Sequence, residues 1–353
     1  MLMEIIFYAA ILIVFYIYIG HYLAISLLSR KKNFKYNDNK KKLNFSIIIP
    51  VNQKSDTLKK KVDNTLDFNY PKNKFEIIIV DSNNGENDKI VKKFSSYDKK
   101  LKYLKQNGET LNNAINCGLK IAKGDLIVKT DFDTFLPKNS LNIFNNIFLS
   151  YNNIGVISAS HDPAGSGLLN FYRKFSVNIR YYESLLGSTW IPGEFFAFRK
   201  NIVKKIPETK LIADDFYITL NSIKKGFRVI SIKDVKAKEY DDYDTIEFLK
   251  RLRRWFSQCI YTALAEFKGI TSNLNFFLIS LKNLIHLTIE PLLILFIIFY
   301  LLTKMPYVLL LFLTLLTLLS LKKEIRYYLL CFLAFQIVIP ISFIYAILRI
   351  EKW

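Results

Sequence analysis

Apolar residues gather at the two ends of this chain, and that distribution constrains its fold more than any other feature of the sequence. Residues 1–28 are nearly all apolar, and further apolar stretches follow at 284–302, 305–321 and 327–348. Each stretch is close to the roughly 20 residues that a helix needs to cross a bilayer. The first is too long for a cleaved signal peptide, so we expect it to be an anchor. The sequence therefore predicts about four transmembrane helices around a more polar middle region.

Basic residues indicate on which side of a membrane the middle region lies. The chain has 50 Lys and Arg against 30 Asp and Glu, a net charge of +20, which implies an anionic partner such as nucleic acid, membrane lipids or a phosphorylated substrate. Basic clusters follow the first apolar stretch at 30–32 and 40–42, and another at 322–326 separates the last two. By the positive-inside rule they predict a multi-pass cell-membrane protein with a cytoplasmic middle domain. A nucleic-acid binder would not need the apolar stretches, so we expect no nucleic-acid partner.

Cysteine and histidine usage argues against several chemistries. The three cysteines show no paired spacing; they are Cys117, Cys259 and Cys331. Neither a disulfide framework nor a zinc site follows from them. The three histidines are scattered, so nothing supports a Ser/His/Asp or Cys/His nucleophile.

The middle region alternates between short apolar runs and amphipathic segments. The apolar runs predict strands at 45–50, 75–81, 101–104, 125–130 and 195–198. The amphipathic segments predict helices at 55–66, 87–97 and 110–122. Strand and helix alternating at this pace is typical of a mostly parallel sheet covered on both faces, so we expect an α/β, Rossmann-like fold.

Polar residues fall at the ends of three of these strands. Asn52 follows the first strand, Asp81 ends the second, and Asp131 and Asp133 follow the fourth. Ligands of open α/β sheets bind at the carboxyl ends of the strands, so we expect these groups to share one crevice. Two such carboxylates favour a cation between them, and oxygen ligands suit Mg²⁺ or Mn²⁺ that carries a substrate phosphate. A solvated turn or a helix cap is the alternative for an isolated Asp-x-Asp pair.

Two amphipathic helices are predicted after the sheet. Residues 168–186 have an apolar side and separate basic residues, which fits a helix in the membrane interface or an ordinary helix that faces the core. In residues 245–267, Arg251, Arg254 and Trp255 lie at i, i+3 and i+4 and so share one face. Two guanidinium groups beside an aromatic ring suit a diphosphate and the sugar or acceptor near it. A basic helix on the membrane surface is the alternative.

Ionisable residues also occur at two other helix positions. Asp214 and Asp215 stand at a predicted helix start, where interaction with the helix dipole explains one carboxylate more readily than two. Lys282, His286 and Glu290 stand four residues apart on one face of an apolar stretch, and such groups usually line the interior of a helix bundle. They predict either a structural His286 to Glu290 pair or a contact with a lipid phosphate.

Together these residues form ordered motifs that resemble those of membrane-bound family 2 type glycosyltransferases with a GT-A fold, a group that includes cellulose and hyaluronan synthases and ceramide glucosyltransferases. The motifs cover roughly residues 44–256 and read SIIIPVN, IIIVDSNN, NAINCGLKIAKGDLIVKTDFD, IADDF and RLRRW. The resemblance implies four parts. They are a transmembrane anchor at 1–29, a cytoplasmic GT-A domain at 40–243, an interface helix with the RxxRW motif at 244–272, and a membrane domain of three helices at 273–353.

The resemblance also implies roles for the motif residues. Those expected to bind the nucleotide sugar are Pro50, Val51, Asn52, Asp81, Asp131, Arg251, Arg254 and Trp255. Asp131 and Asp133 would hold Mg²⁺ or Mn²⁺, Asp214 and Trp255 would face the acceptor, and Asp215 would be the general base. The sequence departs from the pattern at three places: Arg251 replaces a common glutamine, Asp214 replaces a common glutamate, and a lysine that often precedes the third motif is absent.

The implied reaction is an inverting transfer of a sugar from a nucleotide sugar, with UDP-sugar preferred, at the cytoplasmic face of the membrane. Four spans are fewer than processive synthases use to build a channel, so a lipid or a lipid-linked glycan is the expected acceptor. The alternative is a processive polysaccharide synthase of the cellulose or hyaluronan synthase type, working as an oligomer or with a partner subunit. An inactive scaffold would be expected to lack Asp133, Asp215 or Trp255, and all three are present.

Overall fold

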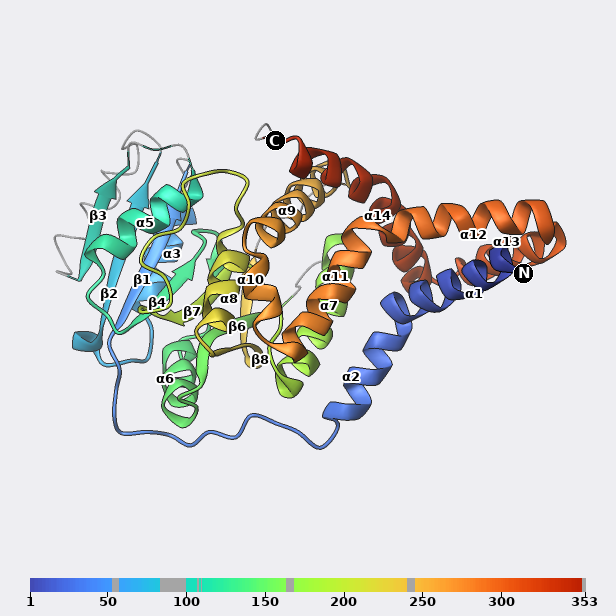
Figure 1. The fold of residues 1–353 in the computed structure, drawn as a ribbon. Helices are drawn as coiled ribbons and strands as arrows, with labels where there is room; N and C mark the ends of the chain where they lie inside the picture. Colours follow the sequence, from blue (N-terminus) through green and yellow to red (C-terminus); the bar gives the residue numbers. More distant parts are fainter. Residues whose placement is uncertain are drawn as a thin grey trace.

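The computed structural model describes residues 1–52, 57–82, 100–106, 108, 110–162, 168–239 and 245–350. An α/β domain lies at one end and a group of apolar helices at the other, and the amino-terminal helices belong to the second group (Figure 1). The helix predicted at 87–97 and the first two residues of the helix predicted at 55–66 lie outside the described residues.

The α/β domain is built on a mixed sheet with the strand order β3-β2-β1-β4-β7-β6-β8-β5. Its strands are β1 (Phe45–Val51), β2 (Phe75–Asp81), β3 (Leu101–Lys105), β4 (Leu126–Thr130), β5 (Thr134–Phe135), β6 (Ile154–His161), β7 (Phe195–Arg199) and β8 (Arg228–Glu239). The strands β1 to β4 pair in parallel, whereas β7 runs antiparallel to both β4 and β6. The predicted α/β fold is confirmed, and β7 makes the sheet mixed.

Helices cover both faces of the sheet. These are α3 (Thr57–Leu66), α5 (Leu111–Ile121), α6 (Ser140–Ser150), α7 (Leu168–Leu186) and α8 (Asp214–Lys224). Successive residues of a strand point to opposite faces, so Ile47 packs in the core beneath α3 and α6, while Ile48 packs in the core beneath α5 and α8. A strand buried on both faces needs an uninterrupted apolar run, which explains the FSIIIPV sequence of β1.

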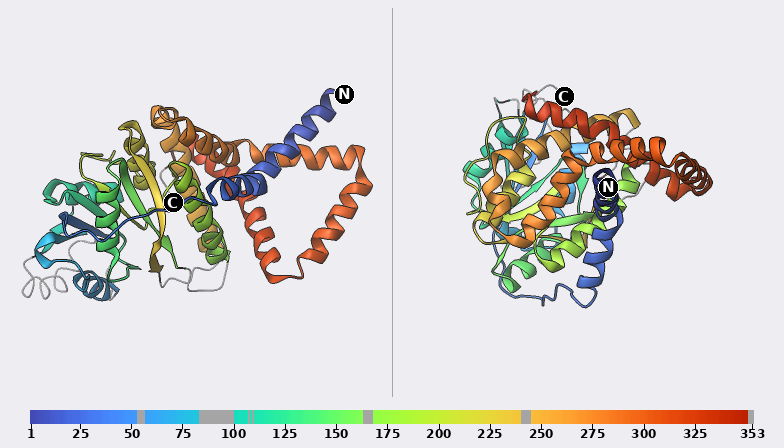
Figure 2. Two further views of the ribbon diagram at one scale, coloured as in Figure 1. Left: turned by 90° about the horizontal axis from the view of Figure 1, so that it is seen from below. Right: turned by 45° about the vertical axis from the view of Figure 1, so that its right-hand side comes forward.

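The second group contains the apolar helices and the predicted interface helix. Its elements are α1 (Leu2–Phe15), a π-helical segment (Tyr16–Gly20), α2 (His21–Ser29), α9 (Thr245–Ala265), α10 (Phe267–Thr271), α11 (Leu274–Thr288), α12 (Glu290–Lys304), α13 (Pro306–Leu319) and α14 (Lys323–Ile347). Helices α1, α12 and α13 extend away from the α/β domain (Figure 2). Helix α9 packs against α14 through Phe248, Leu252 and Phe256 on its apolar face, and it also contacts α8 of the α/β domain.

The prediction of four transmembrane helices is confirmed only in part. By length and composition, two helices of the described chain are able to span a membrane, Leu2–Ser29 and Ile325–Ile347. The stretch predicted as one helix at 284–302 is bent by 58° where α11 gives way to α12, so this pair counts at most as a third span. The bend falls where Pro291 occupies the first turn of α12, a position that proline favours because it needs no amide donor. Helix α13 is apolar but short.

Helix α7 fits the core-facing interpretation of its sequence pattern, and its position in a membrane interface stays a prediction. It packs on β8 of the sheet, as an ordinary core-facing helix would. It also contacts α2 and α14, where Tyr22 stacks on Phe175 and Tyr328 meets the edge of the same ring. Helix α7 therefore joins the α/β domain to the apolar helices.

Candidate active site

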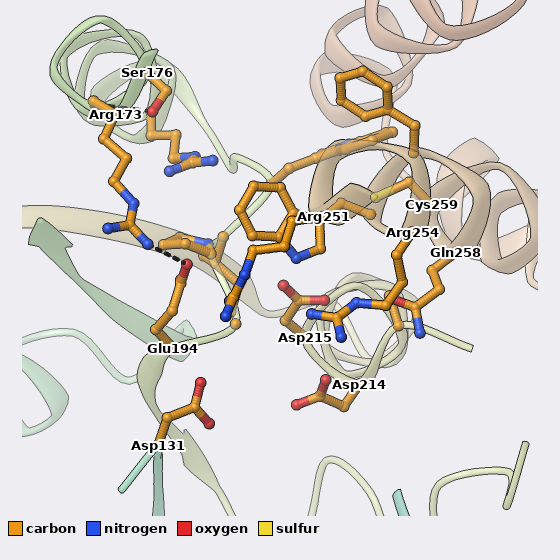
Figure 3. Close-up of a pocket in the computed structure, with 18 of the residues that line it drawn as sticks. Asp131, Arg173, Ser176, Glu194, Asp214, Asp215, Arg251, Arg254, Gln258 and Cys259 are labelled. Atoms are coloured by element: carbon orange, nitrogen blue, oxygen red, sulfur yellow. Dashed lines mark hydrogen bonds and ion pairs between the residues drawn. The ribbon is translucent and has the colours of Figure 1, made fainter. Parts of the chain in front are cut away.

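A continuous cavity of about 750 Å³ runs from the carboxyl ends of the parallel strands to the apolar helices. Every site residue predicted from the sequence lines it except Asp81; they are Pro50, Val51, Asn52, Asp131, Asp133, Asp214, Asp215, Arg251, Arg254 and Trp255. Figure 3 shows several of these side chains facing one space between the sheet, α7 and α9. Segments that are far apart in the sequence thus meet in one place, as the sequence predicted.

Asp81 lies beneath this cavity and does not form its wall. Its side chain is fully buried, and one carboxylate oxygen accepts a hydrogen bond of 2.7 Å from the Tyr103 hydroxyl. The next residue, Ser82, does line the cavity, and its amide and hydroxyl both donate to the Val51 carbonyl. The predicted nucleotide contact of Asp81 therefore stays a prediction.

Lys129 of β4 connects three segments of the site. Its side chain is 2% exposed, and its ammonium donates to the Gly193 carbonyl at 2.6 Å and lies 2.7 Å from an Asp131 carboxylate oxygen. A carboxylate oxygen of Asp214 is 3.7 Å away. Burial alone would lower the pKa of Lys129, but Asp131 and Asp214 raise it above the ordinary value, so the charge is retained. Sequence analysis missed this residue, although a lysine inside an apolar strand was a visible signal.

A second buried lysine supports the loop that carries Asp131 and Asp133. The Lys61 ammonium of α3 donates to the Thr130 hydroxyl at 2.8 Å and to the Thr134 carbonyl. Burial lowers the pKa of Lys61 to about 7, and the charges of Asp131 and Asp133 act in the opposite direction. The two hydrogen bonds from Lys61 therefore hold both ends of this loop, while Asp131 and Asp133 line the cavity.

Asp214 and Asp215 begin α8, and their carboxylates oppose each other electrostatically. Burial, followed by the charge of Asp214, raises the pKa of Asp215 to about 8. The amide of Phe216 donates to Asp215 at 2.6 Å, which partly stabilises its ionised form. A Cβ added at Gly193 would lie 3.0 Å from Asp215 Oδ2, so a side chain there would require this carboxylate to shift by a few tenths of an ångström. This is the setting of a carboxylate able to take up a proton near neutral pH.

Helix α9 supplies the cationic wall. Arg251, Arg254 and Trp255 line the cavity, and Figure 3 shows Arg254 extending towards Asp215. Arg253, between them, turns away: its guanidinium lies 4.5 Å from the centre of the Tyr345 ring on α14. The spacing of the RxxRW motif thus places Arg251, Arg254 and Trp255 on the face of α9 that lines the cavity. Arg253 lies on another face, where it contacts α14.

Glu194 is a further cavity residue that sequence analysis missed. One carboxylate oxygen is 3.3 Å from His161 and the other is 3.7 Å from Arg173 of α7. Although burial would raise the pKa of Glu194, these partners lower it well below the ordinary value. Glu194 therefore stays ionised and links α7 to the loop before β7.

The carboxylates of the cavity fit a divalent cation. The carboxylates oppose one another: after burial, Glu194 and Asp214 contribute to the raised pKa of Asp131, and one buried oxygen of Asp214 has no hydrogen-bond partner. Among the described residues, however, no group of three or more His, Cys, Asp or Glu side chains is arranged to hold a metal. A cation at Asp131 and Asp133 would take its other ligands from a substrate or from water, as Mg²⁺ commonly does.

Comparison with known proteins agrees with this geometry. Residues 46–206 match the family described as Glycosyl transferase family 2. The chain is 22% identical over 214 residues to "Probable glycosyltransferase YdaM" of Bacillus subtilis (strain 168), a match that covers 55% of this chain and 50% of that protein. The chain thus matches about half the length of this relative.

A second curated relative has a more specific name. The chain is 26% identical over 239 residues to the "Dolichyl N-acetyl-alpha-D-glucosaminyl phosphate 3-beta-D-2,3-diacetamido-2,3-dideoxy-beta-D-glucuronosyltransferase" of Methanococcus voltae, covering 59% of this chain and 71% of that protein. Among solved structures, "Mannosyltransferase PcManGT from Pyrobaculum calidifontis in complex with GDP-Man and Mn2+" is similar with a TM-score of 0.76 and 19% identity, over 97% of this chain and 99% of that one. This likeness confirms a GT-A-like α/β fold and extends over the apolar helices.

Proposed function

We propose that this chain, which carries a glycosyl transferase family 2 domain, transfers a sugar from a nucleotide sugar to a lipid-linked acceptor at a membrane surface. The observation that carries the proposal is the cavity itself. It joins the acidic strand ends to side chains of the apolar helices, among them Tyr18, Phe332 and Phe335. A polar donor and an amphiphilic acceptor are able to meet inside such a space.

The donor is proposed to lie between the strand ends and α9. Asn52 and Ser82 line the side towards β1 and β2, where the nucleotide would bind. Asp131 and Asp133 would hold Mg²⁺ or Mn²⁺, which, when bound, would neutralise charge on the diphosphate. Arg254 would stabilise the same negative charge as the bond to the sugar breaks. The Pyrobaculum calidifontis neighbour, named as a complex with GDP-Man and Mn2+, is a precedent for such a donor on this fold.

The acceptor is proposed to enter from the apolar helices. Aromatic side chains line that end of the cavity, including Phe175, Tyr328 and Phe335. Leu2–Ser29 and Ile325–Ile347 would cross the membrane, with the α/β domain in the cytoplasm as the basic residues after α2 indicate. The name of the Methanococcus voltae relative contains a dolichyl-linked sugar phosphate, which supports a lipid-linked acceptor here.

Asp215 is proposed to act as the general base. An acceptor hydroxyl would give its proton to Asp215 while its oxygen forms a bond to the anomeric carbon. The bond from that carbon to the diphosphate would break, and its electron pair would leave with the diphosphate. Lys129 would hold Asp131 and the Gly193 carbonyl in place beside Asp215 during this step.

The pH dependence of the reaction is expected to report the pKa of Asp215 and the effect of Asp214 on it. A base must be deprotonated to act, so kcat/KM of the wild type should fall as the pH is lowered through about 8, the pKa of Asp215. In an Asp214→Asn variant the like charge is gone, which lowers the pKa of Asp215 and moves this limb to lower pH. Initial rates of transfer measured from pH 5 to 10 check the shift. An acid limb at the same pH in both proteins would contradict the coupling.

Donor choice and metal use are tested together by a nucleotide-sugar panel. Purified full chain is incubated with UDP-, GDP- and dTDP-sugars, and release of the nucleoside diphosphate is followed with Mg²⁺, with Mn²⁺ and with a chelator. We expect slow hydrolysis of one donor class that the chelator stops. A matched Asp131→Asn and Asp133→Asn double variant should resemble the chelated wild type. No release from any donor, or release that is indifferent to chelator, would contradict the proposed donor site.

A further inference from the structure

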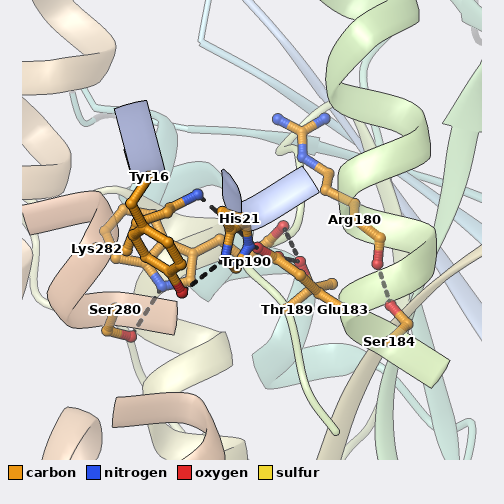
Figure 4. A network of polar contacts seen from close by, with 9 residues as sticks. All are labelled: Tyr16, His21, Arg180, Glu183, Ser184, Thr189, Trp190, Ser280 and Lys282. Carbon is orange, nitrogen blue, oxygen red and sulfur yellow. Dashed lines mark hydrogen bonds and ion pairs between the residues drawn. The ribbon is translucent and has the colours of Figure 1, made fainter. Parts of the chain in front are cut away.

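Lys282 of α11 is a buried cation whose hydrogen-bonding capacity is not used within the described structure. Its side chain is 10% exposed and lines the cavity. Its ammonium lies 3.9 Å from a carboxylate oxygen of Glu183, close enough for an ion pair but too far for a hydrogen bond. Among the described residues no other ion pair or hydrogen bond of this ammonium occurs. Figure 4 shows it beside the polar network of Glu183.

Glu183 is already satisfied by nearer partners. One of its oxygens lies 2.8 Å from a ring nitrogen of His21 in α2, and the other accepts a 2.5 Å hydrogen bond from the Thr189 hydroxyl. Burial would raise the pKa of Glu183, but the hydrogen bond from His21 and the charge of Lys282 lower it, so the carboxylate is ionised. Glu183 thus forms an ion pair with Lys282 at 3.9 Å but accepts no hydrogen bond from the three N–H donors of its ammonium.

An ammonium in such a place carries an energetic cost. A buried charge is costly unless hydrogen bonds replace those it made to water, and one ion pair at 3.9 Å replaces few of them. The lining of this cavity includes the aromatic and apolar side chains of Tyr328, Phe332 and Leu287, together with the polar Asn283 and His286. An anionic ligand would recover the missing interactions at Lys282.

Arg180 of α7 adds a second cation to the same cavity. Its side chain lines the wall, and no ion pair or hydrogen bond of its guanidinium to another described residue occurs. Figure 4 shows it extending away from Glu183, the carboxylate that lies 3.9 Å from Lys282. Arg180 is therefore a cation of the same cavity that is separate from the pair of Lys282 and Glu183.

We propose that Lys282 forms a binding subsite for the phosphate group of an amphiphilic ligand whose hydrocarbon part lies against the apolar helices. This inference rests on the proposed function, in which that phosphate belongs to the lipid-linked acceptor. The subsite holds the phosphate next to the donor region, and the attached sugar then reaches towards Asp215. A phosphate on a membrane phospholipid has the same chemistry, so the two sources are compared directly.

The test measures binding of farnesyl phosphate and farnesol to the detergent-purified full chain, by the concentration dependence of its melting temperature. We expect farnesyl phosphate to bind the wild type more tightly than farnesol. Lys282→Gln should weaken the phosphate ligand roughly 10- to 100-fold, the loss of hydrogen bonds to a charged group, and leave farnesol unchanged. Lys282→Arg should retain most of the affinity. Lys268→Gln, at an exposed lysine on α10, is the matched control and should behave as the wild type.

The same variants separate this subsite from the proposed function. Binding of farnesyl phosphate that depends on Lys282 and that vesicles of phosphatidylglycerol do not displace identifies the acceptor as the ligand. Binding of the vesicles that depends on Lys282 identifies a phospholipid headgroup. Either result supports a phosphate subsite. Equal affinity for farnesyl phosphate and farnesol, or unchanged phosphate affinity in Lys282→Gln, overturns it. Donor hydrolysis is measured in the wild type and in Lys268→Gln, so its absence in both would count against the proposed function and not against the subsite.

Discussion

Replacing Asp215 by Asn is expected to abolish sugar transfer while donor binding persists. The amide has nearly the same shape as the carboxylate but does not accept a proton from the acceptor hydroxyl, so the rate should fall about 10²–10⁴-fold. The donor contacts proposed for Asp131, Asp133 and Arg254 come from other segments and remain. Transfer is measured with labelled donor in membranes that carry the variant, and donor binding by equilibrium titration with the nucleotide sugar.

A surface carboxylate provides the control for this substitution. Asp67 lies 2.6 Å from Lys138 with most of its side chain exposed, and Asp67→Asn should leave both binding and transfer unchanged. If Asp215→Asn transferred sugar at the rate of Asp67→Asn, Asp215 would not be the base. If it lost donor binding as well, the residue would act in donor binding instead.

Replacing Lys129 by Met is expected to be the most damaging substitution for stability. It removes the buried ammonium that binds Asp131 and the Gly193 carbonyl, and so leaves a carboxylate and a carbonyl without their partner. Loss of one partner of a buried ion pair typically costs about 3–5 kcal/mol. At this chain length the melting temperature should fall by roughly 4–7 °C. Thermal unfolding of the purified full chain measures the change.

Two further variants distinguish this loss from a general effect of removing charge. Lys120 is an exposed lysine of α5, and Lys120→Met should melt close to the wild type. Adding Asp131→Asn to Lys129→Met removes the uncompensated carboxylate and should recover part of the lost stability, as a double-mutant cycle detects. A Lys129→Met protein that melts with the wild type, or no coupling in the cycle, would show that Lys129 does not compensate Asp131.

The half of the fold formed by β1 to β4 was predictable because its signals are local. Apolar runs such as 45–50 and 75–81 are short, are interrupted by helical segments and end in polar residues, and together these features indicate parallel buried strands. The convergence of Asn52, Asp131 and Asp133 then follows from the geometry of a parallel sheet. The antiparallel direction of β7 was not predictable, since the run at 195–198 carries no information about strand direction.

The interior cations of the site were not predictable for a related reason. Lys61 lies in the sequence Lys59-Lys60-Lys61, and only tertiary packing shows that the third of these is buried beneath the Asp131 loop. Lys129 was visible as an exception within a strand, but its partners at Gly193 and Asp214 are more than 60 residues away in the sequence. Local patterns do not identify such partners.

The predicted number of membrane spans is confirmed only in part because hydropathy does not record bends. The stretch 284–302 is apolar apart from His286, Thr288 and Glu290, yet the helix changes direction by 58° there. Glu290 is fully buried and accepts a hydrogen bond from Tyr18 of the π-helical segment, 272 residues earlier in the chain. A polar contact of this range becomes visible only when the amino-terminal and carboxyl-terminal helices are seen together.

In the proposed reaction, one cavity brings a nucleotide sugar and a lipid acceptor together at Asp215. A decisive experiment incubates the full chain with a labelled nucleotide sugar and a membrane lipid extract, separates the organic phase, and compares the wild type with Asp215→Asn. We expect one added sugar on a lipid that partitions into the organic phase, and almost none in the variant. Label in a water-soluble product of high mass, or equal label in the organic phase from both proteins, would contradict it.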